Sequence, residues 1–395
     1  MHPPDADSVL VRHGELGVKS NQVRRKMEQQ LADNLRAMLD ARDLSGDIEQ
    51  RRNRLLIHTD QPEDVTAAAA DTFGVTSASA VTTVEPTLSA IKTALATTAR
   101  GQYDGGTFAV NARRAGPANA HPFSSTDIES DGGTAVWEAI EELGGEPAVN
   151  LNDPNFELFV ECRADEAYVF CEKCSGPGGL PLGTQRPVVA LISGGIDSPV
   201  AAWKLMKRGA PVIPVYVDLG DYGGPDHRAR AVSTVKTLAS YAPRHDLSIN
   251  VVDAGDVVTD LSQNLGSLRM LVLRRFMLAV AENIAHDCDA AGIVTGEAIG
   301  QKSSQTSANI AVTDAATTLP VYRPNLTVDK SEITNRARTI GTFEDSTIDT
   351  GCNRVAPSHP ETNASLEAVR VAEPNDLFER AEACAKDRVV VPIES

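Results

Sequence analysis

The chain has 395 residues and a formal net charge of -17 at pH 7, and this length exceeds what one hydrophobic core usually organises, so it predicts two or three domains. No apolar run approaches the roughly 18 residues of a membrane span, and the N-terminus lacks the basic start and apolar core of a signal peptide, so we expect a cytoplasmic protein without membrane association. The six cysteines are too few for a disulfide scaffold at this length, and each is treated as a reduced thiol.

The first 60 residues predict a small α+β unit. The strand SVLVRHGEL opens it, the helix NQVRRKMEQQLADNLRAML follows with apolar residues at helical spacing, and a second strand lies at RLLIHT. Residues 61–174 alternate again between helices and strands and end in the pair FELFVEC and AYVFCEK. We expect this second segment to be a separate small α+β domain.

The chain changes character after a connector at residues 175–186, which is rich in glycine and proline. VVALIS and PVIPVYVD are apolar runs without polar alternation, which is typical of parallel strands covered on both faces. With the helices between them and two further strands, they predict a doubly wound α/β sheet of Rossmann type from about residue 187 to 345. We assign residues 187–395 to this domain, with an acidic C-terminal tail.

The stretch LISGGIDSPVAAW joins the first of these strands to a helix. Ser198 is predicted as the N-cap and Pro199 as the first helical residue, so Ser193, Gly194 and Gly195 lie between the strand and the helix N-terminus. Backbone N–H groups and the helix dipole converge there, which favours a phosphate, although a simple glycine turn is the alternative. The spacing differs from both GxGxxG and GxxxxGKS.

SGGxDS in this setting resembles the pyrophosphate loop (PP-loop) of the ATP pyrophosphatases, which cleave ATP between the α- and β-phosphates. The resemblance implies that the loop holds the departing pyrophosphate. It also implies that Asp197 binds or orients Mg²⁺, whose charge offsets that of the phosphates. A second N-cap or an ordinary loop carboxylate is the alternative for Asp197.

Longer stretches resemble the tRNA 4-thiouridine synthase (tRNA uracil 4-sulfurtransferase) family, in order over about residues 8–360. They include VRHGELGVKSNQVRRKMEQQL, VTGEAIGQKSSQT and YRPNLTVDKSEITNRARTIGTFE. The middle segment, with FAVNARRAG and HPFSSTDI, is similar to the family's THUMP module, and the first unit is similar to its ferredoxin-like domain. The resemblance is to a short form without a rhodanese domain, of the halophilic archaeal type.

The resemblance implies a two-step reaction at uridine 8 of tRNA. ATP adenylates uracil O4, and a sulfur nucleophile then displaces AMP and leaves 4-thiouridine. Arg274 has an alternative as a solvated helix residue, whereas Gly296 follows a strand at the edge where open α/β sheets bind ligands. The implied ATP site comprises Leu191, Ile192, Ser193, Gly194, Gly195, Asp197, Ser198, Tyr216, Val217, Arg274, Gly296 and Gln305.

Two further residues are candidates for catalysis. Lys330 would face the α-phosphate and stabilise charge as the adenylate forms, although an exposed lysine in a first helical turn is the alternative. The family's usual segment carries two adjacent cysteines where this chain has Gly351 and Cys352. Cys352 could carry a persulfide, favoured by the nearby Arg354 and His359, and a non-catalytic loop thiol is its alternative.

The sulfur donor stays open. Many bacterial relatives append a rhodanese domain with a second cysteine, and this chain ends before one, so we expect sulfur from a carrier protein, a cysteine desulfurase or inorganic sulfide. A role in thiazole synthesis and a homodimeric state also stay open. Cys171 and Cys174 form a CxxC pair, for which ordinary strand and linker residues compete with a metal, iron–sulfur or redox site.

Basic residues in the first two domains suggest contacts with tRNA phosphates, among them Lys19, Arg24, Arg113 and Arg114, although a solvated basic face is the alternative. The acidic average is typical of a surface adapted to molar salt, where the Debye length is about 3 Å, and it does not exclude an RNA partner. Avoidance of nucleic acid is the rival interpretation of this charge. The functional alternatives are another PP-loop enzyme that 2-thiolates tRNA and a non-catalytic THUMP RNA-binding protein.

Overall fold

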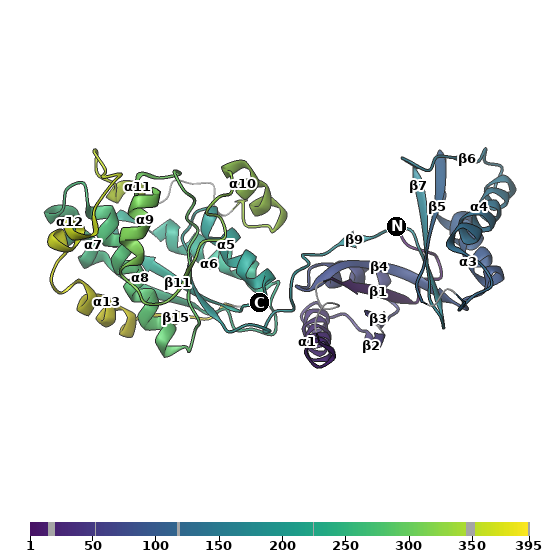
Figure 1. The fold of residues 1–395 in the computed structure, drawn as a ribbon, viewed down its shortest axis with the longest axis horizontal. Coiled ribbons are helices and arrows are strands. Elements are labelled where there is room, and N and C mark those ends of the chain that lie inside the picture. The colour runs from purple at the N-terminus through teal and green to yellow at the C-terminus, as the bar shows by residue number, and fades with distance from the viewer. Residues whose placement is uncertain (15–19, 52, 117–118, 224, 345–351, 394–395) are drawn as a thin grey trace. The chain divides into compact units, whose positions relative to one another are not determined.

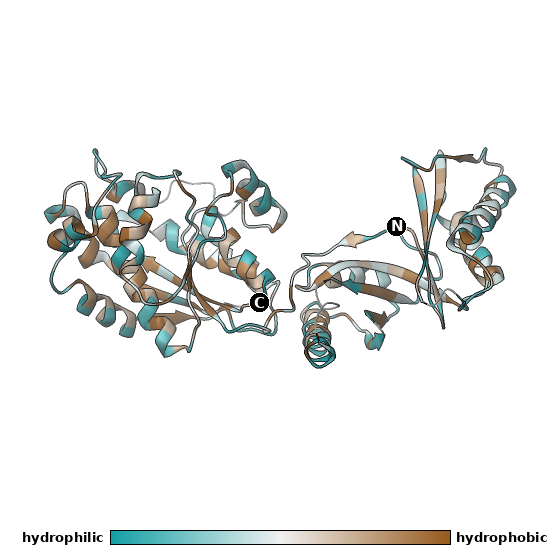
Figure 2. Cartoon of the chain, viewed as in Figure 1, coloured by the Kyte–Doolittle hydropathy of each residue, from teal (hydrophilic) through white to brown (hydrophobic). Residues whose placement is uncertain are grey.

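The computed structural model describes the chain outside residues 15–19, 52, 117–118, 224, 345–351 and 394–395. The described residues form two compact units, Met1–Leu180 and Pro181–Ser395 (Figure 1). Each unit has its own sheet, and the central strands of both sheets are mostly hydrophobic (Figure 2). None of the helices in these ranges is long and apolar enough to cross a membrane.

The first unit is built on one mixed sheet, with strand order β2-β3-β1-β4-β8-β7-β5-β6 and with β9 paired to β4. The long strand β4 joins its two halves, because it pairs with β1 along most of its length and with β8 at its end. The strands are β1 (Ser8–His13), β2 (Asp47–Arg51), β3 (Arg54–His58), β4 (Val75–Val84), β5 (Thr107–Arg114), β6 (Ala148–Val149), β7 (Phe156–Cys162), β8 (Ala167–Phe170) and β9 (Cys174–Ser175).

Two helix pairs cover this sheet: α1 (Asn21–Asp40) with α2 (Pro62–Ala70), and α3 (Leu88–Gln102) with α4 (Ser125–Glu142). Helix α1 places Leu31 and Leu35 in a core with β1 and β3, and this core also includes Val65 of α2 and Val75 of β4. The first core therefore extends beyond residue 60, where the sequence places the end of the first domain. Helices α3 and α4 share a second core with β5 and β7.

The second unit contains a sheet with strand order β14-β13-β10-β11-β12-β15, parallel throughout except at β15. This arrangement confirms the predicted doubly wound α/β fold. The strands are β10 (Val188–Leu191), β11 (Val212–Asp218), β12 (Ile249–Asp253), β13 (Ile293–Val294), β14 (Val321–Tyr322) and β15 (Val389–Val391).

Helices lie on both faces of this sheet. On one face α5 packs against α6 and α10, and on the other α8 packs against α7, α9 and α13. The helices are α5 (Asp197–Lys207), α6 (Pro225–Ala239), α7 (Gly255–Asn264), α8 (Arg269–Asp287), α9 (Ser307–Asp314), α10 (Lys330–Thr339), α11 (Cys352–Val355), α12 (Leu366–Ala372) and α13 (Leu377–Lys386), with short 3₁₀ turns η2 (Gly220–Tyr222) and η3 (Ser303–Gln305).

The C-terminal tail is part of the domain. Leu377 and Ala381 of α13 are buried in the same core as α8, and β15 then pairs antiparallel with β12 at the edge of the sheet. The sequence analysis identified neither element, because the valine strand has only three residues and the apolar stripe of α13 consists mostly of small residues, Ala381 and Ala385 beside Leu377.

His13, at the end of β1, is buried in the first unit. Burial lowers its pKa to about 4, and the positive charges of Arg54 and Arg24 act in the same direction. The Glu28 carboxylate lies 3.7 Å from Nε2, which is too far for a good hydrogen bond to stabilise the imidazolium. The folded state therefore favours the neutral ring.

We expect the free energy of unfolding of the first unit to fall as the pH falls from about 6.5 to 4. In this range His13 is protonated in the unfolded chain but stays neutral in the folded one, so protonation stabilises the unfolded state. The full effect is about 3 kcal/mol, at 1.36 kcal/mol for each pKa unit. His13→Leu should remove this pH dependence. Both proteins carry Trp203→Phe, so that the fluorescence of Trp137 reports unfolding of the first unit alone. An unchanged pH slope in this variant would contradict the assignment.

Candidate active site

The candidate site lies at the carboxyl ends of β10 and β13. The chain runs from β10 outward to β11 and β12, then returns to place β13 on the other side of β10. The loops that follow β10 and β13 therefore diverge onto opposite faces, and open α/β sheets bind ligands at such a switch point. A cavity of about 220 Å³ opens there, lined from both loops and from α8 and η3.

The loop after β10 is held by the two serines that flank it. The Ser193 amide donates to Ser198 Oγ at 2.9 Å, and the Gly195 amide lies 3.3 Å from Ser193 Oγ. Helix α5 begins at Asp197, with Ile196 in the cap position. The predicted N-cap role of Ser198 is therefore wrong, because its hydroxyl serves the loop amide instead. The first amides of α5 have no acceptor within the helix and favour an anion.

Gly296 allows β13 to approach this helix closely. A Cβ at Gly296 would lie 2.6 Å from the Ser198 nitrogen and 2.7 Å from the Asp197 carbonyl carbon. Both neighbours are backbone atoms, so they cannot turn aside as the end of a side chain could. The two walls of the cavity can meet only if this residue has no side chain.

The segment after β14 crosses the start of α5. Asn325 is fully buried and donates from Nδ2 to the Asp197 carbonyl oxygen at 2.9 Å. Lys330, the first residue of α10, forms an ion pair of 2.6 Å with Asp197 Oδ1. The structure thus brings together two predicted catalytic residues that are 133 positions apart.

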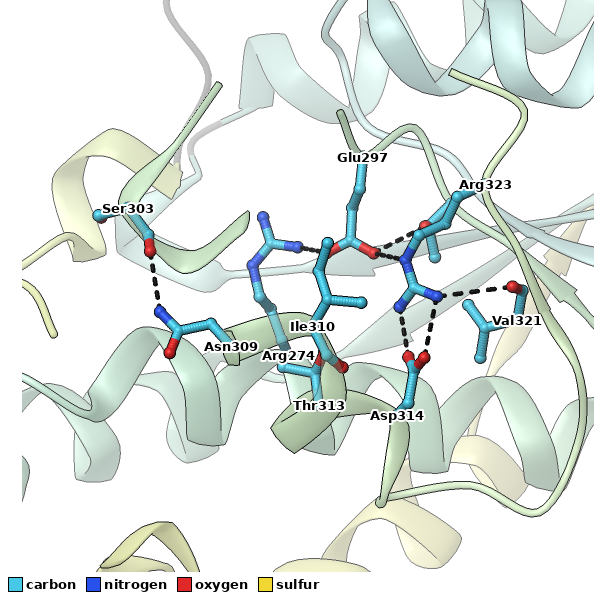
Figure 3. Close-up of polar contacts among 10 residues, drawn as sticks. Arg274, Glu297, Ser303, Asn309, Ile310, Thr313, Asp314, Val321 and Arg323 are labelled. Carbon is cyan, nitrogen blue, oxygen red and sulfur yellow. Dashed lines mark hydrogen bonds and ion pairs between the residues drawn. The ribbon is translucent and has the colours of Figure 1, made fainter. Parts of the chain in front are cut away.

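A network of arginines and carboxylates lies beside the cavity (Figure 3), and two of its members, Arg274 and Glu297, line it. Glu297 pairs with Arg274 of α8 and, at 2.6 Å, with Arg323. Arg323 also pairs with Asp314 at the end of α9. Burial disfavours the charge of Glu297, but the two guanidinium groups outweigh this and lower its pKa.

Most of the predicted nucleotide-binding residues line this cavity. Arg274 is among them, and with its side chain only 21% exposed it is not the solvated helix residue of the alternative. Gln305 accepts a hydrogen bond from Arg274 at 3.0 Å when its amide is oriented to donate to the Ala298 carbonyl oxygen. The predicted residues in the lining are Leu191, Ser193, Gly195, Asp197, Ser198, Arg274, Gly296 and Gln305.

Four predicted residues are not in the cavity lining. Ile192 continues the pairing of β10, since its amide donates to the Val215 carbonyl oxygen at 2.8 Å. Gly194 faces His227 of α6. The side chains of Tyr216 and Val217 are buried in β11. Contacts of these four residues with a nucleotide stay predictions.

Cys352 is the first residue of α11, and its side chain and residues 345–351 lie outside the described parts of the chain. Ala356, four residues later, lines the cavity, and its carbonyl oxygen accepts from Arg269 at 2.9 Å. The backbone at Cys352 is therefore about one helical turn from the cavity wall. The persulfide role of Cys352 stays a prediction.

The described residues contain no group of three or more His, Cys, Asp or Glu side chains that could hold a metal ion. Burial raises the pKa of Cys171 to about 12 and also raises that of Cys174. A metal, iron–sulfur or redox role for these two cysteines stays a prediction beside the interpretation as ordinary strand and linker residues. As a single carboxylate at the loop, Asp197 could supply at most part of a Mg²⁺ site.

The predicted RNA-binding residues have different surroundings in the first unit. Arg113 is exposed on β5, and Arg24 lies 3.7 Å from Glu28. Arg114 donates to the Phe123 carbonyl oxygen, so it also holds the connection between β5 and α4. Lys19 lies outside the described residues.

The sequence analysis missed several residues of the cavity. The apolar wall of the cavity comes from α8, and the apolar pattern of that helix predicts burial but not ligand binding. Glu297 directly follows Gly296, and its spacing from other residues does not predict that it pairs with two arginines. The only available signal was an acidic residue at the end of a buried strand. The missed lining residues are Met270, Leu273, Met277, Leu278, Thr295, Glu297, Lys302, Ser303, Ser304, Thr313 and Ala356.

Comparison with protein families covers almost the whole chain. Residues 183–377 match the model "Thiamine biosynthesis protein (ThiI)", residues 8–79 match the ThiI ferredoxin-like domain and residues 85–172 match the THUMP domain. A probable tRNA sulfurtransferase of Halobacterium salinarum is 58% identical over 98% of both chains. Its counterpart in Methanosarcina acetivorans is 39% identical over 92% of this chain and 88% of that protein.

A solved structure agrees with these relatives. A 4-thiouridine synthetase, determined as an RNA complex with bound ATP, superposes with a TM-score of 0.84 over 98% of this chain and 100% of that one, at 27% identity. The ferredoxin-like and THUMP matches fall within the first unit, and the match to residues 183–377 falls within the second. Sequence identity, coverage and fold agree, and the chain belongs to the tRNA sulfurtransferase family.

Proposed function

We propose that this chain uses ATP to transfer sulfur to uridine 8 of tRNA and so forms 4-thiouridine. The observation that carries the proposal is the meeting of Asp197 and Lys330 at the N-terminus of α5, beside a cavity with one apolar and one charged wall. A cleft with an anion-binding helix end and an ammonium group fits a reaction in which pyrophosphate leaves ATP.

The cavity suits a nucleotide in both halves. Leu273, Met277 and Leu278 of α8, with Leu191, provide an apolar wall for a flat base. The loop at Gly195 and the first turn of α5 provide backbone amides for phosphate oxygens. A triphosphate that lies along this path places its α-phosphate near Lys330.

The chemistry proceeds in two displacements. Uracil O4 attacks the α-phosphorus of ATP, the bond to the bridging oxygen breaks, and pyrophosphate leaves toward the amides at Gly195. Lys330 offsets the charge that develops on the α-phosphate oxygens. A sulfur nucleophile then attacks C4 of the adenylated uracil, and AMP departs with the former O4 oxygen.

Asp197 fits Mg²⁺ as a single carboxylate, because Mg²⁺ bound with nucleotide phosphates usually takes only one or two protein carboxylates. Lys330 occupies one oxygen, Oδ1, of this group. When bound, Mg²⁺ would neutralise phosphate charge in the adenylation step.

Cys352 is proposed to carry the sulfur as a persulfide, because α11 leads into the cavity wall at Ala356. A cysteine desulfurase or a carrier protein would supply the outer sulfur of this persulfide. That sulfur would attack C4 as AMP leaves, and two external thiols would then reduce the disulfide between Cys352 and the uracil sulfur, forming a disulfide themselves. Inorganic sulfide, the third donor class, would attack C4 directly without a persulfide. The first unit is proposed to hold the tRNA, with Arg113 and Arg24 near phosphates and Lys19 in the same role. A cytoplasmic location and a homodimer are compatible with this function.

Lys330→Met should lower the rate of tRNA-dependent AMP release from ATP by about 100-fold, because the removed charge acts on the reacting phosphate. The assay uses the full chain, unmodified tRNA, radiolabelled ATP and inorganic sulfide, since AMP leaves only when sulfur attacks the adenylated uracil. Lys386→Met is a matched control, because Lys386 forms an ion pair of the same length, 2.6 Å, with Glu382 on α13. Wild-type protein that binds tRNA but releases no AMP would contradict the proposed enzyme and favour a non-catalytic RNA-binding protein.

Gly296→Ala should weaken ATP binding by at least about tenfold, because a new Cβ pushes the first turn of α5 out of place. Isothermal titration calorimetry with ATP measures the effect. Gly266→Ala adds the same methyl group in the same unit where nothing lies within 4 Å, and it should leave the affinity unchanged. Equal affinity of both variants would show that the close approach at Gly296 is not needed for the site.

Cys352→Ala should retain tRNA-dependent pyrophosphate release but reduce thiolation with a protein sulfur donor on the order of 10³-fold, because the sulfur carrier is lost while the ATP site remains. Mass spectrometry of digested tRNA measures 4-thiouridine. Cys288→Ala, at a partly buried position packed on the core of the second unit, is the control. Full thiolation by Cys352→Ala with that donor would reject the persulfide.

A further inference from the structure

Glu297 is a buried carboxylate in the cavity wall, and neither of the two displacements above uses it. Only 6% of the residue is exposed, and it directly follows Gly296, three residues after the end of β13. A buried carboxylate needs charged partners to offset its loss of water. The identity of these partners indicates what it does.

The partners of Glu297 come from two different segments. Oε1 accepts from Arg274 of α8, and Oε2 accepts from Arg323 Nε at 2.6 Å. The hydroxyl of Thr295 adds a third hydrogen bond at 2.9 Å. With Asp314, which pairs with Arg323, the network contains two carboxylates and two guanidinium groups, so its formal charge is balanced (Figure 3).

On one side the network fixes the direction of Arg274. Its guanidinium lies between Glu297 and Gln305, and all three residues line the cavity. A guanidinium held on two sides keeps its remaining donors in one orientation, which reduces the entropy that is lost when it binds a ligand.

On the other side the network fixes the segment that crosses α5. Arg323 stands two residues before Asn325, which bonds to the Asp197 carbonyl oxygen, and seven before Lys330. The side chain of Arg323 is only 6% exposed, so Glu297 anchors the start of this segment in the protein interior.

We propose that Glu297 is a positioning residue that holds Arg274 toward the nucleotide and, through Arg323, holds the segment that presents Lys330. The assignment rests on the proposed ATP-dependent function. It predicts effects on both nucleotide binding and the adenylation rate, since Arg274 lies in the cavity and Lys330 lies at the reacting phosphate.

Glu297→Gln tests the proposal at nearly constant volume. A glutamine has one oxygen acceptor, and its NH₂ group would face a guanidinium donor, so one arginine loses its partner. We expect ATP binding at least tenfold weaker by calorimetry and kcat for tRNA-dependent AMP release at least tenfold lower. Combining it with Lys330→Met should lower kcat by less than the product of the two separate effects.

Glu373→Gln is the matched control. Glu373 pairs with Arg275, the next residue of α8, at 2.7 Å, and that arginine is 1% exposed. Neither residue lines the cavity. Both variants should lower the melting temperature. Glu373→Gln should nevertheless keep ATP affinity and kcat within about twofold of wild type, because the Glu373–Arg275 pair lies outside the cavity lining and acts independently of the site.

Wild-type ATP affinity and kcat in a folded Glu297→Gln variant would overturn the proposal and leave the proposed function intact. Failure of the wild-type chain to bind ATP or release AMP would instead overturn the proposed function. If Glu297→Gln does not fold, Glu297→Asp keeps the charge on a shorter side chain, and it should weaken ATP binding and lower kcat together. Wild-type values in that variant would also reject the positioning role.

Discussion

The second unit depends on the close packing of three chain segments around the first turn of α5. The loop after β10 is hydrogen-bonded to Ser198, Gly296, two residues after β13, lies so close to the first turn of α5 that a Cβ would not fit, and Asn325 bonds to the Asp197 carbonyl oxygen. A helix start that binds an anion must leave its amides free toward the cavity, so other segments must fix its position. The surrounding network of ion pairs supplies that rigidity.

The fold could be predicted from the sequence wherever local pattern and tertiary burial agree. The apolar runs of β10 and β11, the glycine loop and the helix α5 each carry a local signal, and the doubly wound sheet follows from them. The edge strands β2 (Asp47–Arg51) and β15 (Val389–Val391) carry no such local signal, because β2 is largely polar and β15 has only three residues. Ser198 shows a further limit, since a serine before Pro199 matches an N-cap but its hydroxyl accepts from the Ser193 amide, five residues earlier in the loop.

Some residues of the candidate site could also be predicted from the sequence, and others could not. Asp197, Arg274, Gly296 and Gln305 were predictable through resemblance, and the structure places them around one cavity. Glu297 was not, because the meaning of a buried carboxylate depends on partners 23 and 26 positions away. Spacing along the chain does not reveal such pairs when they come from a helix and a loop.

The ion pair between Asp197 and Lys330 has a consequence for binding in concentrated salt. Because Lys330 is already paired with Asp197, the cleft carries little net charge at this point, so a phosphate bound as proposed would exchange partners with Lys330 rather than neutralise an unpaired cation. Salt at about 1 M screens long-range attraction within about 3 Å but acts less on contacts between touching, partly buried groups. Nucleotide affinity built on such an exchange should depend only weakly on ionic strength, which suits a chain with a formal charge of -17.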